Sequence, residues 1–166
     1  MLGVENWQQL LGTFAAAFTE PSLRLFFCLA TAWVICLGRR NITRLYLHAD
    51  PQRKAAHDAY HRFVRAGAWA LATLWKLMAQ AIVSCTYRTG RIPIDLDDTL
   101  YHKSGRNVDG AGWWRDAVRS TGTKLVTAWG LNLVVLTIRV APPWGGEPLG
   151  LPVNMRLHRK GGKNLI

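Results

Sequence analysis

Apolar residues recur at helical spacing in the first half of the chain and at strand spacing in the second half. An amphipathic first helix is predicted by apolar residues at three- and four-residue steps, namely Trp7, Leu10, Leu11, Phe14 and Phe18. Pro21 suits the first turn of a second, more apolar helix that ends near Gly38. We expect the run from Leu25 to Gly38 to be buried, because its fourteen residues are fewer than the roughly 20 needed to cross a bilayer.

Further helices are expected before residue 90. Asn41 or Thr43 can cap a short helix over residues 42–49. A longer helix is expected to start at Asp50-Pro51 and to break at Gly67. The helix that follows this break is expected to be largely buried, because its sequence, "AWALATLWKLMAQAIVS", is mostly apolar.

The second half of the chain has the pattern of β-strands. Residues 92–98 alternate between apolar and polar types, which predicts a strand with one buried face, and Asp98 falls on the apolar side. Residues 124–140 are rich in β-branched types and predict two strands or one long bent strand, with a bend or bulge at Gly130. A further strand is predicted over residues 149–159 after a Gly- and Pro-rich turn. The order of elements predicts an α+β protein whose strands form an antiparallel meander.

The charge of the chain favours a polyanionic partner. Its 166 residues carry 21 Lys and Arg against 10 Asp and Glu, a net charge of +11, and 49% are hydrophobic, which excludes a disordered tail. Nucleic acid is the first candidate partner and an anionic membrane surface the second. Within residues 39–65 the acids are Asp50 and Asp58, and the candidate DNA contacts are Arg39, Arg40, Arg44, Arg53, Lys54, Arg62 and Arg65. This segment is compatible with a helix-turn-helix-like unit, or with a solvated basic helical face.

The cysteines and histidines do not indicate a metal site. The three cysteines lack a C-x-x-C spacing and are interpreted as small buried residues in a reducing compartment. His57 and His61 share a helical face but have no Glu of an H-E-x-x-H site between them. We interpret this pair as part of a polar helix surface.

Three carboxylates lie close together in the predicted strand that follows Gly90. Asp95, Asp97 and Asp98 occupy five positions of a chain that has few acids. A carboxylate on the buried side of a strand is costly unless it is paired or bound to a metal ion, and Mg²⁺ prefers oxygen ligands. This stretch is therefore a candidate wall of a metal site, and a solvated, turn-rich loop is the alternative.

Three longer segments, "IPIDLDDTLYHKSGRNVDGAGWWRDAV", "AWGLNLVVLTIRV" and "PWGGEPLGLPVNMRLHRKGG", carry a family resemblance. They hold, in order, Asp-Asp-Thr at a strand end, Lys and Gly-Arg, a Gly-Ala-Gly loop, Trp-Gly-x-Asn, Leu-Pro-Val and Arg-Leu. This string resembles DDE-superfamily transposases of bacterial insertion sequences. The upstream "RRNITRLYLHA" and "AHDAYHRFVRAGAW" are similar to the helical region that precedes the nuclease in that family, so the resemblance covers roughly residues 39 to 162.

The resemblance implies a ribonuclease-H-like mixed sheet in which two Asp and one Glu hold two Mg²⁺ ions. Asp98, which precedes Thr99, corresponds to the first acid and is the expected catalytic residue and metal ligand, with Asp97 as the neighbouring candidate. Asp95 aligns less well and is expected to face solvent or to form a salt bridge. Basic residues of the loop that follows would contact phosphates or have a structural role, namely Lys103, Arg106 and Arg115.

The resemblance also implies that the active site is incomplete. Beyond Asp98 the acids are Asp109, Asp116 and Glu147, none at a position that matches the second Asp or the Glu. We therefore expect an amino-terminal transposase fragment with a helical, DNA-binding region over residues 1–88 and an incomplete endonuclease domain over residues 89–166. Such a fragment would be inactive by itself.

The expected partner is DNA at transposon ends, in the bacterial cytoplasm on the nucleoid, with self-association and no small-molecule substrate. A DNA-binding remnant that modulates an intact transposase is the first alternative. A small basic membrane-associated protein is the second and less favoured one.

Overall fold

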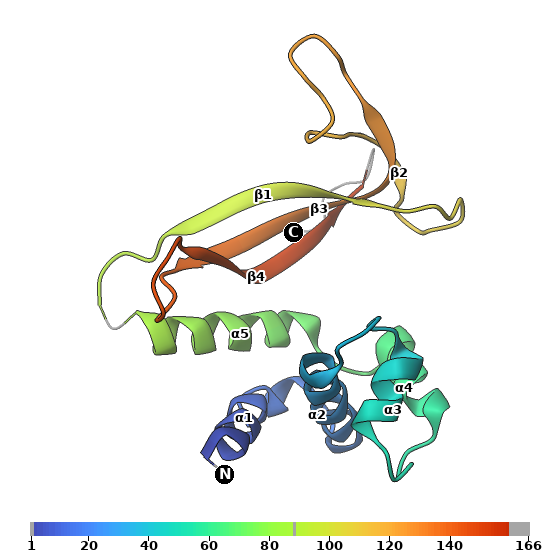
Figure 1. Ribbon diagram of the computed structural model, residues 1–166, viewed down its shortest axis with the longest axis vertical. Helices are drawn as coiled ribbons and strands as arrows, with labels where there is room; N and C mark the ends of the chain where they lie inside the picture. Colours follow the sequence, from blue (N-terminus) through green and yellow to red (C-terminus); the bar gives the residue numbers. More distant parts are fainter. Residues whose placement is uncertain (1, 88, 160–166) are drawn as a thin grey trace. The chain divides into compact units, whose positions relative to one another are not determined.

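The computed structural model describes residues 2–87 and 89–159, and the chain falls into two compact units, Met1–Ala81 and Ile82–Ile166. Helices occupy the first part of the sequence and strands the second (Figure 1). The α+β class predicted from the sequence is therefore confirmed. Residue 88, at the expected domain boundary, and residues 160–166, which include the end of the family resemblance, lie outside the described residues.

The helices follow one another with short connections. Within the described residues they are α1 (Leu2–Gly12), the short 3₁₀ helix η1 (Ala15–Ala17), α2 (Glu20–Ile35), α3 (Ile42–Ala49), α4 (His57–Ala66) and α5 (Leu71–Thr86). Helix α1 ends at Gly12, so Phe14 and Phe18 lie outside the helix in which they were expected. Pro21 lies in the first turn of α2, as predicted. Asn41 is the residue that caps α3, because its Oδ1 accepts the backbone N–H of Arg44 at 2.8 Å.

Helix α4 begins at His57, and the helix start expected at Asp50-Pro51 is wrong. The Asp50 carboxylate accepts the backbone N–H groups of Lys54 at 2.9 Å and of Ala55 at 2.7 Å, which closes a loop between α3 and α4. Arg53 in this loop has a φ of 53°, which no helix accommodates. These backbone hydrogen bonds, mainly that from Ala55, hold the pKa of Asp50 below its ordinary value.

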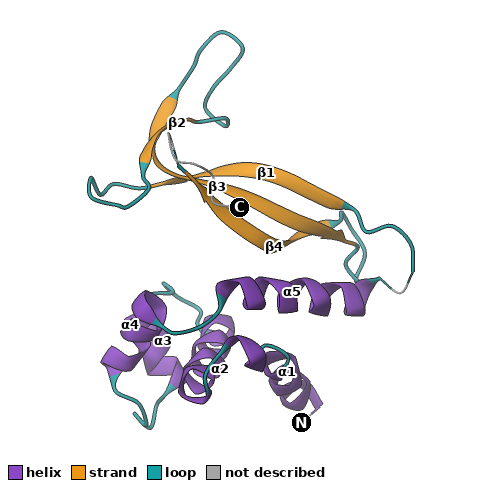
Figure 2. Cartoon of the chain, turned by 180° about the vertical axis from the view of Figure 1, so that it is seen from behind, coloured by secondary structure: helices purple, strands orange, loops and turns teal. Residues whose placement is uncertain are grey.

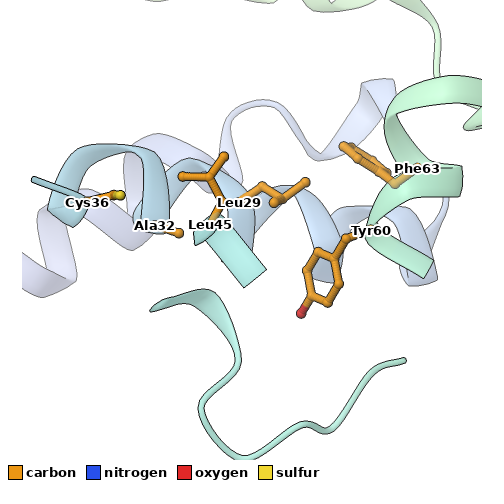
Figure 3. Close-up of a cluster of buried hydrophobic side chains, with 6 residues drawn as sticks. All are labelled: Leu29, Ala32, Cys36, Leu45, Tyr60 and Phe63. Carbon is orange, nitrogen blue, oxygen red and sulfur yellow. The ribbon is translucent and has the colours of Figure 1, made fainter. Parts of the chain in front are cut away.

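The core of the helical unit joins α2, α3 and α4 (Figure 3). Its buried members come from all three helices, namely Leu29, Ala32, Cys36, Leu45, Tyr60 and Phe63. Partly buried aromatic rings extend it, and Phe18 stacks on Phe26 with ring centroids 4.5 Å apart. This core fixes how the two basic helices, α3 and α4, are presented.

Several expectations of burial are wrong. The end of the apolar run Leu25–Gly38 is exposed: Val34 is 62% exposed because α2 contacts the core through one face only, and Leu37, which follows the helix, is 100% exposed. None of the residues of α5 is buried. Of the cysteines, Cys36 alone is buried, while Cys28 is half-buried and Cys85 is exposed. In the described part of the chain no single helix is long and apolar enough to span a membrane, and α4 with α5 reaches that criterion only as a pair bent by 90°.

A four-stranded antiparallel sheet forms the second unit (Figure 2). The strands that the structure describes are β1 (Ile94–His102), β2 (Gly112–Arg115), β3 (Thr127–Val140) and β4 (Leu149–His158). Strands β1, β2 and β4 each pair with β3. Of the two alternatives predicted for residues 124–140, the single long strand is the one observed. Every described pairing is antiparallel, as the meander predicts, and β2 was not anticipated. The mixed, ribonuclease-H-like sheet implied by the resemblance stays a prediction.

Gly130 lies where three strands meet. It pairs with His102 of β1 and with Gly112 of β2, so these two strands flank β3 on opposite edges. A Cβ atom at Gly130 would lie 2.4 Å from the carbonyl oxygen of Tyr101. The registers of β1 and β2 on β3 show no shift at Gly130, so a bulge there is not found, and the register shift between β3 and β4 falls at Leu136 and Thr137.

Candidate functional site

The carboxylate of Asp98 projects from β1 into solvent. The alternation that places Asp98 with Ile94 and Leu96 is confirmed by the register of β1 on β3. The expected burial of this face is wrong, because Asp98 is exposed and Leu96 is 71% exposed. Asp98 Oδ2 lies 3.4 Å from the Nδ2 donor of Asn132, which is 8% exposed on β3. The buried amide of Asn132 on β3 thus donates a hydrogen bond to one oxygen of the exposed Asp98 carboxylate.

Asp97 has a different environment from that of Asp98. Neighbouring residues of a strand direct their side chains to opposite faces, so the two carboxylates diverge. Asp97 Oδ1 accepts the backbone N–H of Asp98 at 2.9 Å. This local hydrogen bond steadies the β1 backbone at Asp98. Asp97 is therefore placed to support Asp98 and not to share an ion with it on one face.

A pocket of about 450 Å³ contains Asp98 and the segment that follows β2. It is lined by residues of β1, including Asp98 and His102, and by residues 115–119. Asp116 is 4% exposed, and its Oδ1 accepts the backbone N–H of Arg119 at 3.1 Å. Its Oδ2 lies 3.1 Å from His102 Nε2 and 3.5 Å from Arg119 Nε. Three acids, Asp97, Asp98 and Asp116, and one histidine thus line one pocket, although Asp116 is already engaged.

Asp95, the third acid of the stretch, forms a salt bridge. Arg139 Nε donates to Asp95 Oδ2 at 3.0 Å, and Arg139 Nη2 donates to Oδ1 at 3.3 Å. This bidentate pair ties β1 to β3 on the sheet face opposite to Asp98. The prediction that Asp95 faces solvent or forms a salt bridge is confirmed.

The candidate DNA contacts of the helical unit are all exposed: Arg39, Arg40, Arg44, Arg53, Lys54, Arg62 and Arg65. The two acids of this segment neutralise little of this positive charge. Asp58 forms an exposed ion pair with Arg62 at 3.3 Å, and Asp50 is 7% exposed and turned toward its own loop. His57 and His61 lie on the same helix with ring centroids 4.6 Å apart. Residues 39–65, which comprise α3, α4 and the segments before and between them, therefore carry a strong excess of exposed positive charge.

Comparison with known proteins decides the family. A family model described as DDE superfamily endonuclease matches residues 13–146. The chain belongs to this family. Searches of curated proteins and of solved structures gave no significant match. The match starts upstream of the resemblance seen in the sequence and includes α2, α3, α4 and the β1–β3 pair.

DNA is the substrate that a DDE superfamily endonuclease domain implies, and the family generally depends on divalent metal ions. Among the described residues, the donor set beside Asp98 fits one ligand of such an ion and not a two-ion centre. Among the described residues no group of three or more His, Cys, Asp or Glu side chains is arranged to hold a metal ion. Asp98 is the accessible carboxylate on its face of β1 and is the residue that would contact a cation.

Two further acids that follow β1 in the sequence, Asp109 and Glu147, lie outside the pocket of Asp98. Asp109 forms a bidentate pair with Arg159, at 2.9 and 2.6 Å, and this guanidinium holds the pKa of Asp109 below its ordinary value. Glu147 lies in the exposed loop between β3 and β4. Neither lines the pocket of Asp98, whereas Asp97 and Asp116 do.

The sequence predicted Asp98 but missed the residues around it. His102 lies four residues after Asp98 on β1, and this even spacing places both on the same face. Asn132 belongs to the Trp-Gly-x-Asn string, which contributed to the family resemblance but did not predict that Asn132 contacts Asp98. No local sequence pattern predicted the position of Asp116, because only the folded sheet brings the turn after β2 close to Asp98 and His102.

Lys103 and Arg106, the other predicted DNA contacts, lie in the connection between β1 and β2. Lys103 Nζ is 4.3 Å from the centroid of the Tyr101 ring. Both basic residues line a second pocket with Trp113 and Trp129. The aromatic members of this pocket were not anticipated as functional residues. Arg115, the third basic residue of this region, lines the pocket of Asp98 instead.

Proposed function

We propose that this DDE endonuclease is a transposase component that binds transposon DNA and contributes Asp98 as the first metal-binding acid of the reaction. The observation that carries the proposal is the exposed Asp98 carboxylate, anchored by Asn132 within the segment matched by the family. The position of Asp98 immediately before Thr99 supports it, because the resemblance places the first acid there. A bacterial insertion sequence is the proposed source of such a component.

In a complete site, divalent cations activate a water, and then a DNA 3′-hydroxyl, for attack on phosphodiesters. Asp98 would hold and orient a cation, and Asn132 would keep one carboxylate oxygen in position. One carboxylate does not keep two ions in register. We therefore propose that these 166 residues bind DNA but do not transfer strands by themselves.

DNA binding is assigned to α3, α4 and the loop between them. The exposed cations of these segments can neutralise phosphates. Arg44 lies in α3 and Arg62 in α4, so substitution of these two residues tests both helices. A regulatory role is the second candidate function, because a chain that binds transposon ends without cutting them would compete with an intact transposase. The excess of positive charge in α3, α4 and the loop between them favours this regulatory role, because it supports DNA binding without cleavage.

The test combines binding and cleavage on one substrate. The purified chain is incubated with supercoiled plasmid in Mg²⁺ or Mn²⁺, beside an Asp98→Asn variant. The expected result is retention of the plasmid by both proteins, without strand-transfer products. Strand transfer by the unaltered chain that disappears in Asp98→Asn would show a complete site and overturn the proposed incompleteness. Failure of the folded chain to bind DNA would overturn the function.

A further inference from the structure

A pocket built from aromatic and basic side chains lies beside the end of β1. It has a volume of about 450 Å³ and is lined by Lys103, Ser104, Arg106, Trp113 and Trp129. This volume falls within the range of about 300–1,000 Å³ that is usual for small-ligand pockets. Acids are absent from this lining, as far as the described residues show.

The aromatic walls of the pocket come from paired strands. Trp113 of β2 is directly opposite Trp129 of β3, and their rings make a T-shaped contact with centroids 6.0 Å apart. Trp129 Nε1 donates to the carbonyl oxygen of Gly105 at 3.0 Å, which fixes the loop that carries the two basic residues. Trp113 remains 59% exposed, so a large indole surface faces solvent.

Tyr101 extends the aromatic surface along the same face of the sheet. It is 54% exposed and pairs with Leu131, which lies two residues from Trp129 on β3. Lys103 Nζ lies above the Tyr101 ring at 4.3 Å, so a positive charge and aromatic rings are held together. Residues at even spacing share a face, whereas Asp98 and Tyr101 differ by three and lie on opposite faces.

We infer that this pocket binds an unpaired nucleotide of the DNA substrate, with the base stacked on Trp113 and the phosphate beside Lys103 and Arg106. Aromatic rings stack on a base only when the base has left the duplex, because the faces of paired bases are covered by their neighbours. Cations close to such rings complement the phosphate that accompanies the base. The inference rests on the proposed function, since it takes DNA as the substrate, and it adds a single-strand site on the face opposite to Asp98.

The experiment measures binding of the full chain to two fluorescein-labelled DNAs by fluorescence anisotropy. One probe is single-stranded oligothymidylate, and the other is a duplex of the same length. Trp113→Ala is compared with Trp144→Ala, which removes a 79% exposed tryptophan from the loop between β3 and β4. We expect Trp113→Ala to weaken single-strand binding by about five- to a hundredfold. Duplex affinity should change less than about twofold in both variants, because backbone contacts dominate duplex binding.

Two further variants separate a local effect from misfolding. Trp113→Phe keeps a stacking surface and should retain single-strand affinity within about threefold. Lys103→Gln should weaken single-strand binding and leave the tryptophans in place. Equal single-strand affinity of Trp113→Ala and the unaltered chain, or an equal loss in Trp144→Ala, would overturn this inference alone. Failure of the folded, unaltered chain to bind either DNA would overturn the proposed function as well.

Discussion

Asn132 and Asp98 are diagonal neighbours across the β1–β3 pair, with Asn132 Nδ2 3.4 Å from Asp98 Oδ2. Asn132 is buried, whereas Asp98 is exposed. Across the described residues, Asp98 Oδ1 has no hydrogen-bond partner, so the amide orients one oxygen and leaves the other without a hydrogen bond. The proposed role of Asp98 therefore depends on Asn132 as a positioning residue.

Asn132→Ala is expected to weaken binding of Mn²⁺ to the chain by about tenfold or more, because loss of a residue that orients a ligand costs about 10–100-fold in metal affinity. Isothermal titration with Mn²⁺ measures this change. Asn154→Ala on β4 is the matched control and should leave the affinity unchanged within about twofold. Equal losses in the two variants would contradict a specific role of Asn132.

Gly130→Ala is expected to destabilise the sheet by about 1–3 kcal/mol, the usual cost of overpacking. The added Cβ would lie 2.4 Å from the backbone oxygen of Tyr101, which cannot move without parting β1 from β3. Urea unfolding followed by circular dichroism measures the change. Gly122→Ala is the control, because a Cβ there meets no atom within 4 Å. A stable Gly130→Ala variant would argue against the register of β1 on β3.

The helical unit is expected to lose stability in acid through Asp50. Its pKa is lowered in the folded state, mainly by the N–H groups of Ala55 and Lys54. The stabilisation is therefore complete above the ordinary aspartate pKa of about 4 and is lost as the pH falls through the lower folded value. Asp50→Asn should lower the unfolding midpoint at pH 7, because both oxygens are used and an amide offers one acceptor.

Urea midpoints measured between about pH 2 and pH 7 give the comparison for Asp50. The Asp50→Asn protein should show a shallower decline toward acid than the unaltered chain. Asp58→Asn, at an exposed ion pair, should follow the unaltered chain. Parallel declines of the Asp50→Asn protein and the unaltered chain would show that Asp50 does not carry this pH dependence.

Arg44→Ala and Arg62→Ala are expected to weaken duplex binding and to reduce its salt dependence. Each phosphate contact contributes about 0.9 to the slope of log affinity against log salt concentration, so each variant should lower the slope by about one. Anisotropy titrations at several salt concentrations measure the slope. Arg24→Ala is the control, because Arg24 forms an exposed ion pair with Glu20 on α2. The same slope in all proteins would place DNA binding elsewhere.

Much of the local structure could be predicted from the sequence. Pro21 marked the start of one helix, because it fits a first helical turn. Asn41 or Thr43 marked the start of another, and the structure selects Asn41 as the cap. The start of α4 could not be predicted from Asp50, since its side chain bonds the loop and not the first turn of a helix. Side-chain hydrogen bonds of this kind compete with helix formation and depend on the whole loop.

The candidate site was predicted in part. Asp98 was identified from its place in the strand and from the family resemblance, but its exposure was not. Alternation shows which residues share a face and not whether anything covers that face. The approach of Asp116 to His102, and the pairing of Trp113 with Trp129, depend on contacts between strands and a turn that are separate in sequence.

Asp98 is the carboxylate that we propose to bind a divalent cation. Mn²⁺ binding, followed by the electron paramagnetic resonance signal of the free ion, tests it on the unaltered chain, Asp98→Asn and Asp97→Asn. We expect Asp98→Asn to abolish binding at this site and Asp97→Asn, at the neighbouring position on the other face, to retain it. Retained binding in Asp98→Asn, or an equal loss in Asp97→Asn, would show that Asp98 does not hold the cation.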